Sequence, residues 1–225
     1  MPMWSLFAFD AESVAEAILR PAQEAVRNRD LLGWQKVFDQ LNRTHYCPSV
    51  SGKWYSPLAS TITGSVGRRD ALTPDNIPEE SSFGLRRTLQ TFVEQASPHR
   101  VEGTFPRARY WMLRKIAWPK ILSLESELNE LELFNKEVLM RRENLPDPFW
   151  CLESNNAVDS SYVEPKTVAR LAEAEATAGL FRRLVRRSDL DQEVKPLVRD
   201  LATAGLLIEL AASRNLALYF REDGT

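Results

Sequence analysis

The sequence predicts a helix-rich α+β protein, folded as a single domain over residues 1–225, with several amphipathic helices and a small sheet formed by the terminal strands. Apolar residues recur at intervals of three and four along much of the chain, which is the spacing of one face of an α-helix. Short apolar and aromatic runs lie near both ends, at Trp4–Phe9 and Leu216–Phe220, and they are typical of β-strands. A length of 225 residues suits one buried core, or one core with an appendage.

The first predicted strand leads directly into a helix. Asp10 follows the strand and can cap a helix over Ala11–Asn28, whose apolar residues share one face. Pro21 must bend or split that helix, because proline has no amide hydrogen to donate. A second amphipathic segment follows Asp30, and the short link between the two predicts a helical hairpin.

A long irregular region is predicted over residues 43–82. Helical spacing lapses there, and proline and glycine recur among serine and threonine. Short strands are expected at Trp54–Tyr55 and Thr61–Thr63. Loops of this length are uncommon inside compact domains unless they are functional or mobile. Helical spacing resumes between Phe83 and Val93.

The longest periodic segment begins at Pro119 and predicts a helix to about Arg142. Its inner positions have the spacing of a heptad seam: Ile121, Leu124, Leu128, Leu131, Asn135 and Val138. An asparagine in such a seam can fix the register of a coiled coil, but so short a seam in a globular chain favours a core helix. Four glutamates alternate with the seam and are predicted to form the solvent-exposed side of the helix rather than a catalytic pair: Glu125, Glu127, Glu130 and Glu132.

The last third of the chain predicts a strand and two more helices. Phe149–Leu152 is interpreted as a short buried strand. Pro165 occupies the first turn of a helix that could extend to Arg187, and Pro196 begins the last helix in the same way. Asn215 is a plausible end for that last helix, directly before the closing strand.

Charge and composition limit the possible functions. The formal net charge of −2 provides no global positive field for nucleic acid or an anionic membrane. No apolar stretch has the roughly 20 residues needed to cross a bilayer, so no membrane association is predicted. With two cysteines, too few for a disulfide framework, and no basic segment typical of a secretory signal at the start, the chain is expected to be cytoplasmic.

The sequence supports no catalytic residue, metal site or cofactor. His45 and Cys47 place an imidazole near a thiol, as thiol catalysis or metal binding requires. The only other histidine and cysteine, His99 and Cys151, each lie about fifty residues from the nearest of the other three, and no paired spacing preorganises a zinc site. Ordinary packing is the favoured interpretation. Active sites assembled from distant residues are invisible in one sequence, so an enzyme of unrecognised type remains an alternative.

Two basic segments are candidate binding sites. Residues 98–120 combine cations with aromatic stacking platforms and are the best local nucleic-acid signal, although a charge-paired hairpin also explains them: Arg107, Arg109, Tyr110, Trp111, Arg114 and Lys115. A second cluster comprises Arg182, Arg183, Arg186 and Arg187, on adjoining turns of a predicted helix. Its counterpart could be acidic residues near the end of the chain, solvent, or an external acidic protein or nucleic acid.

One local pattern resembles a known family. Tyr162-Val163-Glu164-Pro165 and the residues up to Leu171 are similar to a segment of the bacterial YfbM-like proteins of unknown function. The opening Met1-Pro2-Met3 with its short strand, and the closing helix and strand, have a similar placement. The resemblance implies a small α+β bacterial protein without assigned catalysis, in a group that includes candidates for toxin immunity. It implies no functional residue.

Taken together, these patterns favour a protein-binding module, with an immunity or antitoxin-like protein as its most concrete form. The arginine cluster at 182–187 is predicted to meet an acidic surface on another protein. The two alternatives are an enzyme of unrecognised type and a nucleic-acid-binding protein that uses residues 98–120. The sequence leaves the partner and the oligomeric state open.

Overall fold

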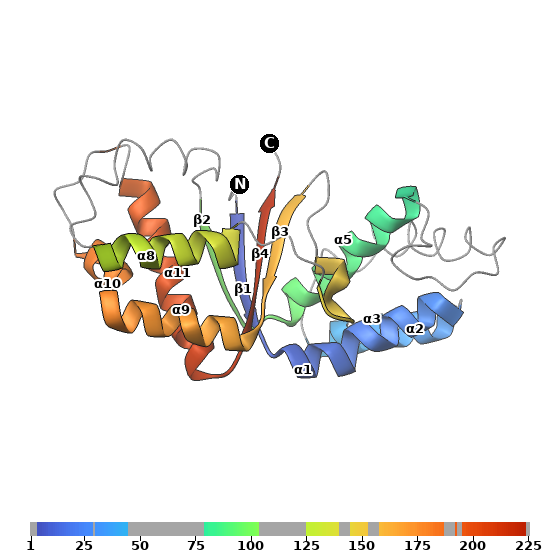
Figure 1. The fold of residues 1–225 in the computed structure, drawn as a ribbon. Coiled ribbons are helices and arrows are strands. Elements are labelled where there is room, and N and C mark those ends of the chain that lie inside the picture. Colours follow the sequence, from blue (N-terminus) through green and yellow to red (C-terminus); the bar gives the residue numbers. More distant parts are fainter. Residues whose placement is uncertain are drawn as a thin grey trace. The chain divides into compact units, whose positions relative to one another are not determined.

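A computed structural model describes residues 4–28, 30–44, 79–103, 125–139, 145–152, 158–186, 192 and 195–223. Most of these residues are helical, and four strands form one antiparallel sheet, which confirms the helix-rich α+β class (Figure 1). Contacts within the chain group it into two compact units. The first comprises residues 1–9, 99–143 and 154–225, and the second comprises residues 10–98 and 144–153. The prediction of a single domain stays a prediction.

The sheet belongs to the first unit and has the strand order β2-β1-β4-β3. The two terminal strands, β1 (Trp4–Phe9) and β4 (Ala217–Asp223), are antiparallel neighbours in its centre, as the sequence predicted. Two strands that were not predicted, β2 (His99–Gly103) and β3 (Val158–Val163), form the edges. Both are short and carry charged or hydroxyl residues, so they lack the apolar run by which the terminal strands were recognised.

Both faces of the central strands are buried. Leu6 of β1 and Leu218 of β4 belong to the core that the sheet shares with α8 (Glu125–Phe134), α9 (Pro165–Ala178), α10 (Leu180–Val185) and α11 (Lys195–Ser213). On the opposite face, the ring of Phe7 stacks on that of Tyr219 with 5.9 Å between centroids. Burial on both faces explains why the runs Trp4–Phe9 and Ala217–Phe220 of these strands are mostly apolar rather than alternating.

The described part of the long helix predicted from Pro119 packs into the protein core. This part consists of α8 followed by η3, a π-helical turn at Asn135–Leu139. Leu131 and Val138 of the seam are buried in the core, and Asn135 is only 4% exposed. Within the described residues the amide of Asn135 has no hydrogen-bond partner. Ile121 and Leu124 lie outside the described residues, as does the side chain of Leu128.

In the second unit, the first predicted helix contains a π-helical turn just before Pro21. The segment consists of α1 (Ala11–Val14), the π-helical turn η1 (Ala15–Leu19) and α2 (Arg20–Asn28). Pro21, which has no amide hydrogen, directly follows the residue that closes the wide turn. Asp30 accepts a hydrogen bond from the amide of Gly33 at the start of α3 (Leu31–Thr44), and α3 packs against α2 in the predicted hairpin.

Two expectations in this unit need correction. The segment Phe149–Leu152 is a 3-10 turn, η4, and not a strand: the amide of Phe149 donates to Pro146, which starts a tight turn. Its predicted burial is right, since Cys151 and Leu152 are fully buried. The ends of the predicted irregular region 43–82 are helical, because α3 continues to Thr44 and α5 spans Glu79–Ala96. Residues 45–78, with the short strands expected there, lie outside the described residues.

Candidate functional site

The arginine cluster lies on α10, a helix that the sequence merged with α9. Pro165 occupies the first turn of α9 as predicted, but the chain breaks the helix at Gly179. Gly179 has φ of 69°, in the left-handed region that favours glycine, and its amide closes α9 by donating to the carbonyl of Glu175. The prediction of one helix from Pro165 to Arg187 is therefore wrong. Because α10 starts anew at Leu180, its first amides need acceptors from outside the helix.

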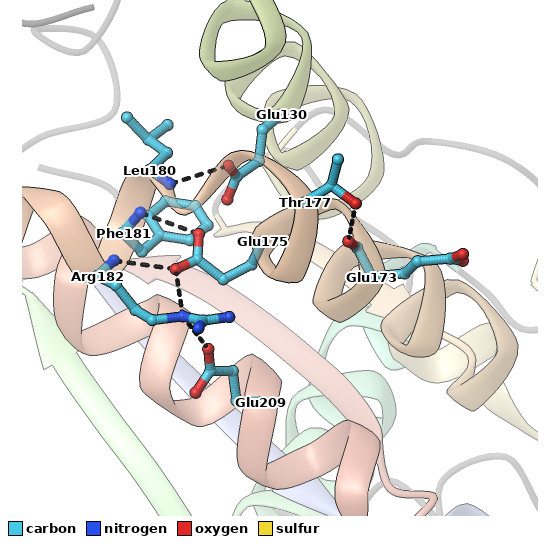
Figure 2. Close-up of polar contacts among 8 residues, drawn as sticks. All are labelled: Glu130, Glu173, Glu175, Thr177, Leu180, Phe181, Arg182 and Glu209. Atoms are coloured by element: carbon cyan, nitrogen blue, oxygen red, sulfur yellow. Dashed lines mark hydrogen bonds and ion pairs between the residues drawn. The ribbon is translucent and has the colours of Figure 1, made fainter.

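Two buried carboxylates supply those acceptors (Figure 2). Glu130 of α8 accepts from the amide of Leu180 at 3.2 Å. Glu175 of α9 accepts from the amides of Phe181 and Arg182 at 3.0 and 2.9 Å. Negative charge at a helix N-terminus is favoured by the helix dipole as well as by the hydrogen bonds. Glu130 is only 3% exposed, so the prediction that it lies on the solvent side of its helix is wrong.

Close packing fixes α10 against its neighbours as well. A Cβ atom on Gly205 of α11 would lie 2.5 Å from the Cβ of Phe181, so only a hydrogen fits there. The ring of Phe181 also meets that of Phe134 edge-on, with 5.6 Å between centroids. The helix is thus held by α8, α9 and α11 together, through hydrogen bonds and through its buried apolar side chains.

The structure divides the predicted arginine cluster. The Nε of Arg182 lies 3.3 Å from the carboxylate of Glu175 and 3.1 Å from that of Glu209 on α11. These acids belong to the chain itself, so for Arg182 the internal explanation holds even though its side chain is 52% exposed. Arg183 is half-buried. Arg186 is exposed and ends α10, and no ion pair joins it to another of the described residues. Arg187 lies outside the described residues.

Further exposed cations follow in the chain. The segment 186–194 connects α10 to α11, whose first turns carry Lys195 and Arg199 on the exposed side. The side chain of Arg199 is 70% exposed, and its Nε lies 3.8 Å from Asp200, at the outer limit of an ion pair. Exposed cations therefore occur both at the end of α10 and at the beginning of the helix against which α10 packs.

The nucleic-acid candidate belongs to a part of the chain that the structure does not describe. Arg107, Arg109, Tyr110, Trp111, Arg114 and Lys115 all lie outside the described residues. Of the segment 98–120, the structure describes residues 98–103, and His99–Gly103 form the edge strand β2. Arg100 and Glu102 of this strand are 3.6 Å apart and exposed.

The described residues offer little for thiol or metal chemistry. His45 and Cys47 lie outside them, and His99 accepts a hydrogen bond from Arg214 at 2.9 Å through its ring nitrogen. Cys151 is fully buried, and loss of solvation raises the pKa of its thiol to about 12. At neutral pH this thiol is protonated and is a poor nucleophile or metal ligand. Among the residues that the structure describes, no three acidic, histidine or cysteine side chains are grouped to hold a metal ion.

The described helices also bear on membrane association. None of those helices is both long and apolar enough to cross a membrane.

In the described part of the first unit, α10 therefore ends at an exposed arginine, Arg186, and its start is held by acids from two other helices. The capping roles of the two glutamates could not be found in the sequence. Glu130 accepts from an amide 50 residues away, and Glu175 accepts from amides that lie beyond the helix break at Gly179. Comparison of the chain with models of known protein families, with curated proteins and with solved structures finds no match.

Proposed function

We propose that this protein binds another protein, and that the arginines at the end of α10 recognise an acidic surface on it. The observation that carries the proposal is the exposed Arg186 on a helix whose start is fixed by the buried Glu130 and Glu175. A preorganised helix loses little conformational entropy on binding, which favours affinity. Arg182 takes no direct part, since its guanidinium is already paired with Glu175 and Glu209.

The chemistry of the arginines favours carboxylates. A guanidinium is a planar group whose parallel N–H donors match the two oxygens of a carboxylate. The net charge of −2 disfavours general attraction to nucleic acid, so local recognition of an acidic protein is the better match. Arg187 follows Arg186 in the sequence and extends the proposed surface on sequence grounds alone. Arg183 takes no direct part, because nitrogens of its guanidinium group are buried.

The most concrete form of this role is an immunity or antitoxin-like protein in the cytoplasm of a bacterium. The resemblance of the Tyr162–Leu171 segment to YfbM-like proteins supports this form, because that group includes candidates for toxin immunity. In such a role, the chain neutralises an acidic partner by covering its surface and needs no catalytic group.

The test is affinity capture of the partner from native cells, read by mass spectrometry and repeated with purified components. Arg186→Glu should reduce capture by about tenfold or more, because an acid would then face the acids of the partner. The melting temperature should stay nearly unchanged, since Arg186 is exposed. The matched control is Arg170→Glu, the same charge reversal at an exposed position of α9, and it should capture the partner normally.

Two outcomes would contradict the proposal. Equal capture by the Arg186→Glu and Arg170→Glu variants would show that α10 is not the contact surface. Salt-sensitive binding of random RNA or DNA by the wild-type chain, with no protein captured, would instead favour the nucleic-acid alternative and residues 98–120.

A further inference from the structure

The edge strand β2 suggests a second interaction surface, independent of the α10 arginines. In the described part of the chain, β2 pairs with β1 on one side, and no strand pairs with its outer side. An unpaired strand edge presents backbone donors and acceptors to any chain that can align with it. Arg100 and Glu102 of this strand are exposed, with side-chain exposures of 64% and 41%.

The charges of β2 are complementary to those of a second copy of the same strand. The strand reads His99-Arg100-Val101-Glu102-Gly103. If two copies pair antiparallel about Val101, Arg100 of each lies directly opposite Glu102 of the other. Residues directly opposite each other in an antiparallel pair are close enough for an ion pair, and opposite charges there are stabilising. The twofold arrangement therefore forms this cross-strand ion pair twice, as an isologous interface does.

A strand of five residues buries too little surface for a stable dimer by itself, because stable complexes bury roughly 1,200 Å² or more. The helix α11 supplies further surface. It contacts both β2 and β1, and its end is tied to the start of β2 by the Arg214–His99 hydrogen bond. Two sheets joined at β2 would place the two α11 helices about two strand spacings apart, roughly 10 Å, which is the distance at which helices pack.

The solvent-exposed side of α11 carries a large apolar residue. Leu206 is 59% exposed, and Leu210, one turn further along, is only partly buried against the core. Among the described residues, the only other large hydrophobic side chain that is exposed is Leu32 on α3, in the second unit. A single exposed leucine is ordinary, but Leu206 lies on the helix next to an unpaired, charge-complementary strand edge.

From this combination we infer that the protein forms a twofold homodimer in which the β2 strands of two copies pair antiparallel about Val101 and the two α11 helices pack through Leu206. The sheet then continues through both copies as eight strands, four from each. The α10 arginines take no part in this interface, so the inference does not rest on the proposed function.

The test is the oligomeric state of the full chain, measured by sedimentation velocity over a concentration series. Wild-type protein should be a dimer. Arg100→Glu places two acids opposite each other at both positions and should weaken dimerisation by about tenfold or more. Glu102→Arg places two cations opposite each other at both positions and should weaken dimerisation as well. Each variant should remain folded, because both positions are exposed, and circular dichroism checks this.

Complementation makes the test specific. Mixing the Arg100→Glu and Glu102→Arg variants places acids opposite cations at both positions, so the two should form a heterodimer, detected by native mass spectrometry. The double variant Arg100→Glu with Glu102→Arg restores the pairing within one chain and should dimerise like the wild type. A monomeric wild type, or variants that fail to recover dimerisation when mixed, would overturn the inference.

The helix contact has its own matched pair of variants. Leu206→Glu should weaken the dimer, because it places an acid in the apolar contact between the two α11 helices. Leu32→Glu makes the same change at the other exposed leucine, and it should leave dimerisation unchanged. Equal dimerisation of both variants would contradict the part assigned to α11.

Discussion

The helices α1 and α10 both need hydrogen-bond acceptors for the free amides of their first turns, and they obtain them from different parts of the chain. Asp10 caps α1 by accepting from the amide and hydroxyl of Ser13, three residues along, and it is exposed to solvent. The caps of α10 are the buried Glu130 and Glu175, and Glu130 lies 50 residues from the amide it binds. A local cap stabilises its own helix, whereas the caps of α10 also join three helices of the core.

The largest effect should come from removing the buried cap. Glu175→Ala leaves the amides of Phe181 and Arg182 without their acceptor and takes a partner from the Arg182 side chain. We expect the free energy of unfolding to fall by about 3 kcal/mol, measured by urea denaturation. Glu173→Ala is the control on the same helix, because Glu173 is exposed, and it should cost less than about 0.5 kcal/mol. Equal losses of unfolding free energy in both variants would show that the buried Glu175 stabilises the protein no more than the exposed Glu173.

The second-largest loss of stability should come from overpacking the contact between α10 and α11. In Gly205→Val, the new side chain would collide with Phe181, whose Cβ already lies 2.5 Å from the position of a Cβ on residue 205. Overpacking of this kind costs about 2 kcal/mol, more than the helix propensity gained by replacing glycine. Thermal unfolding measures the loss. A variant as stable as the wild type would show that α10 can shift away from α11 freely.

The local cap should have a smaller and pH-dependent effect. Asp10→Ala should cost about 1 kcal/mol at neutral pH, the usual value for an exposed helix cap. The hydrogen bond from the Ser13 amide, followed by that from its hydroxyl, lowers the pKa of Asp10 below its ordinary value of 3.8. The charged form is therefore favoured in the folded state, and its contribution is complete above that ordinary value and is lost as the pH falls through the lowered pKa.

The measurement is the difference in unfolding free energy between wild type and Asp10→Ala as the pH is lowered. The difference should be constant from neutral pH down to about the ordinary pKa of 3.8 and then shrink. A difference that grows on acidification would have the wrong sign for a carboxylate whose pKa is lowered in the folded protein.

The contrast between the two caps also explains what the sequence could predict. Asp10 and Pro165 act on residues close to them in the chain, and the helix starts that they predict are confirmed. Pro21 also acts locally, and a π-helical turn lies just before it. The apolar terminal strands were recognised because both of their faces are buried.

Features that depend on distant residues were missed. The edge strands β2 and β3 exist because β1 and β4 are there to pair with them, and their own residues carry no such signal. The residues around Glu130 in the sequence are typical of an exposed glutamate. Its hydrogen bond to the amide of Leu180 forms only because folding brings that distant amide to it. In the candidate site, the arginines were identifiable from their spacing, but the division between Arg182 and Arg186 depends on Glu175 and Glu209.

That division is the central claim, and a pair of matched alanine variants tests it directly. Arg182→Ala should lower the free energy of unfolding by about 1 kcal/mol, because it leaves the buried Glu175 without its cation, and it should retain partner capture. Arg186→Ala should change stability by less than about 0.5 kcal/mol and should lose capture. Opposite phenotypes in stability and capture are the predicted result. The account would be contradicted if Arg182→Ala lost capture at full stability, or if Arg186→Ala lowered stability and left capture intact.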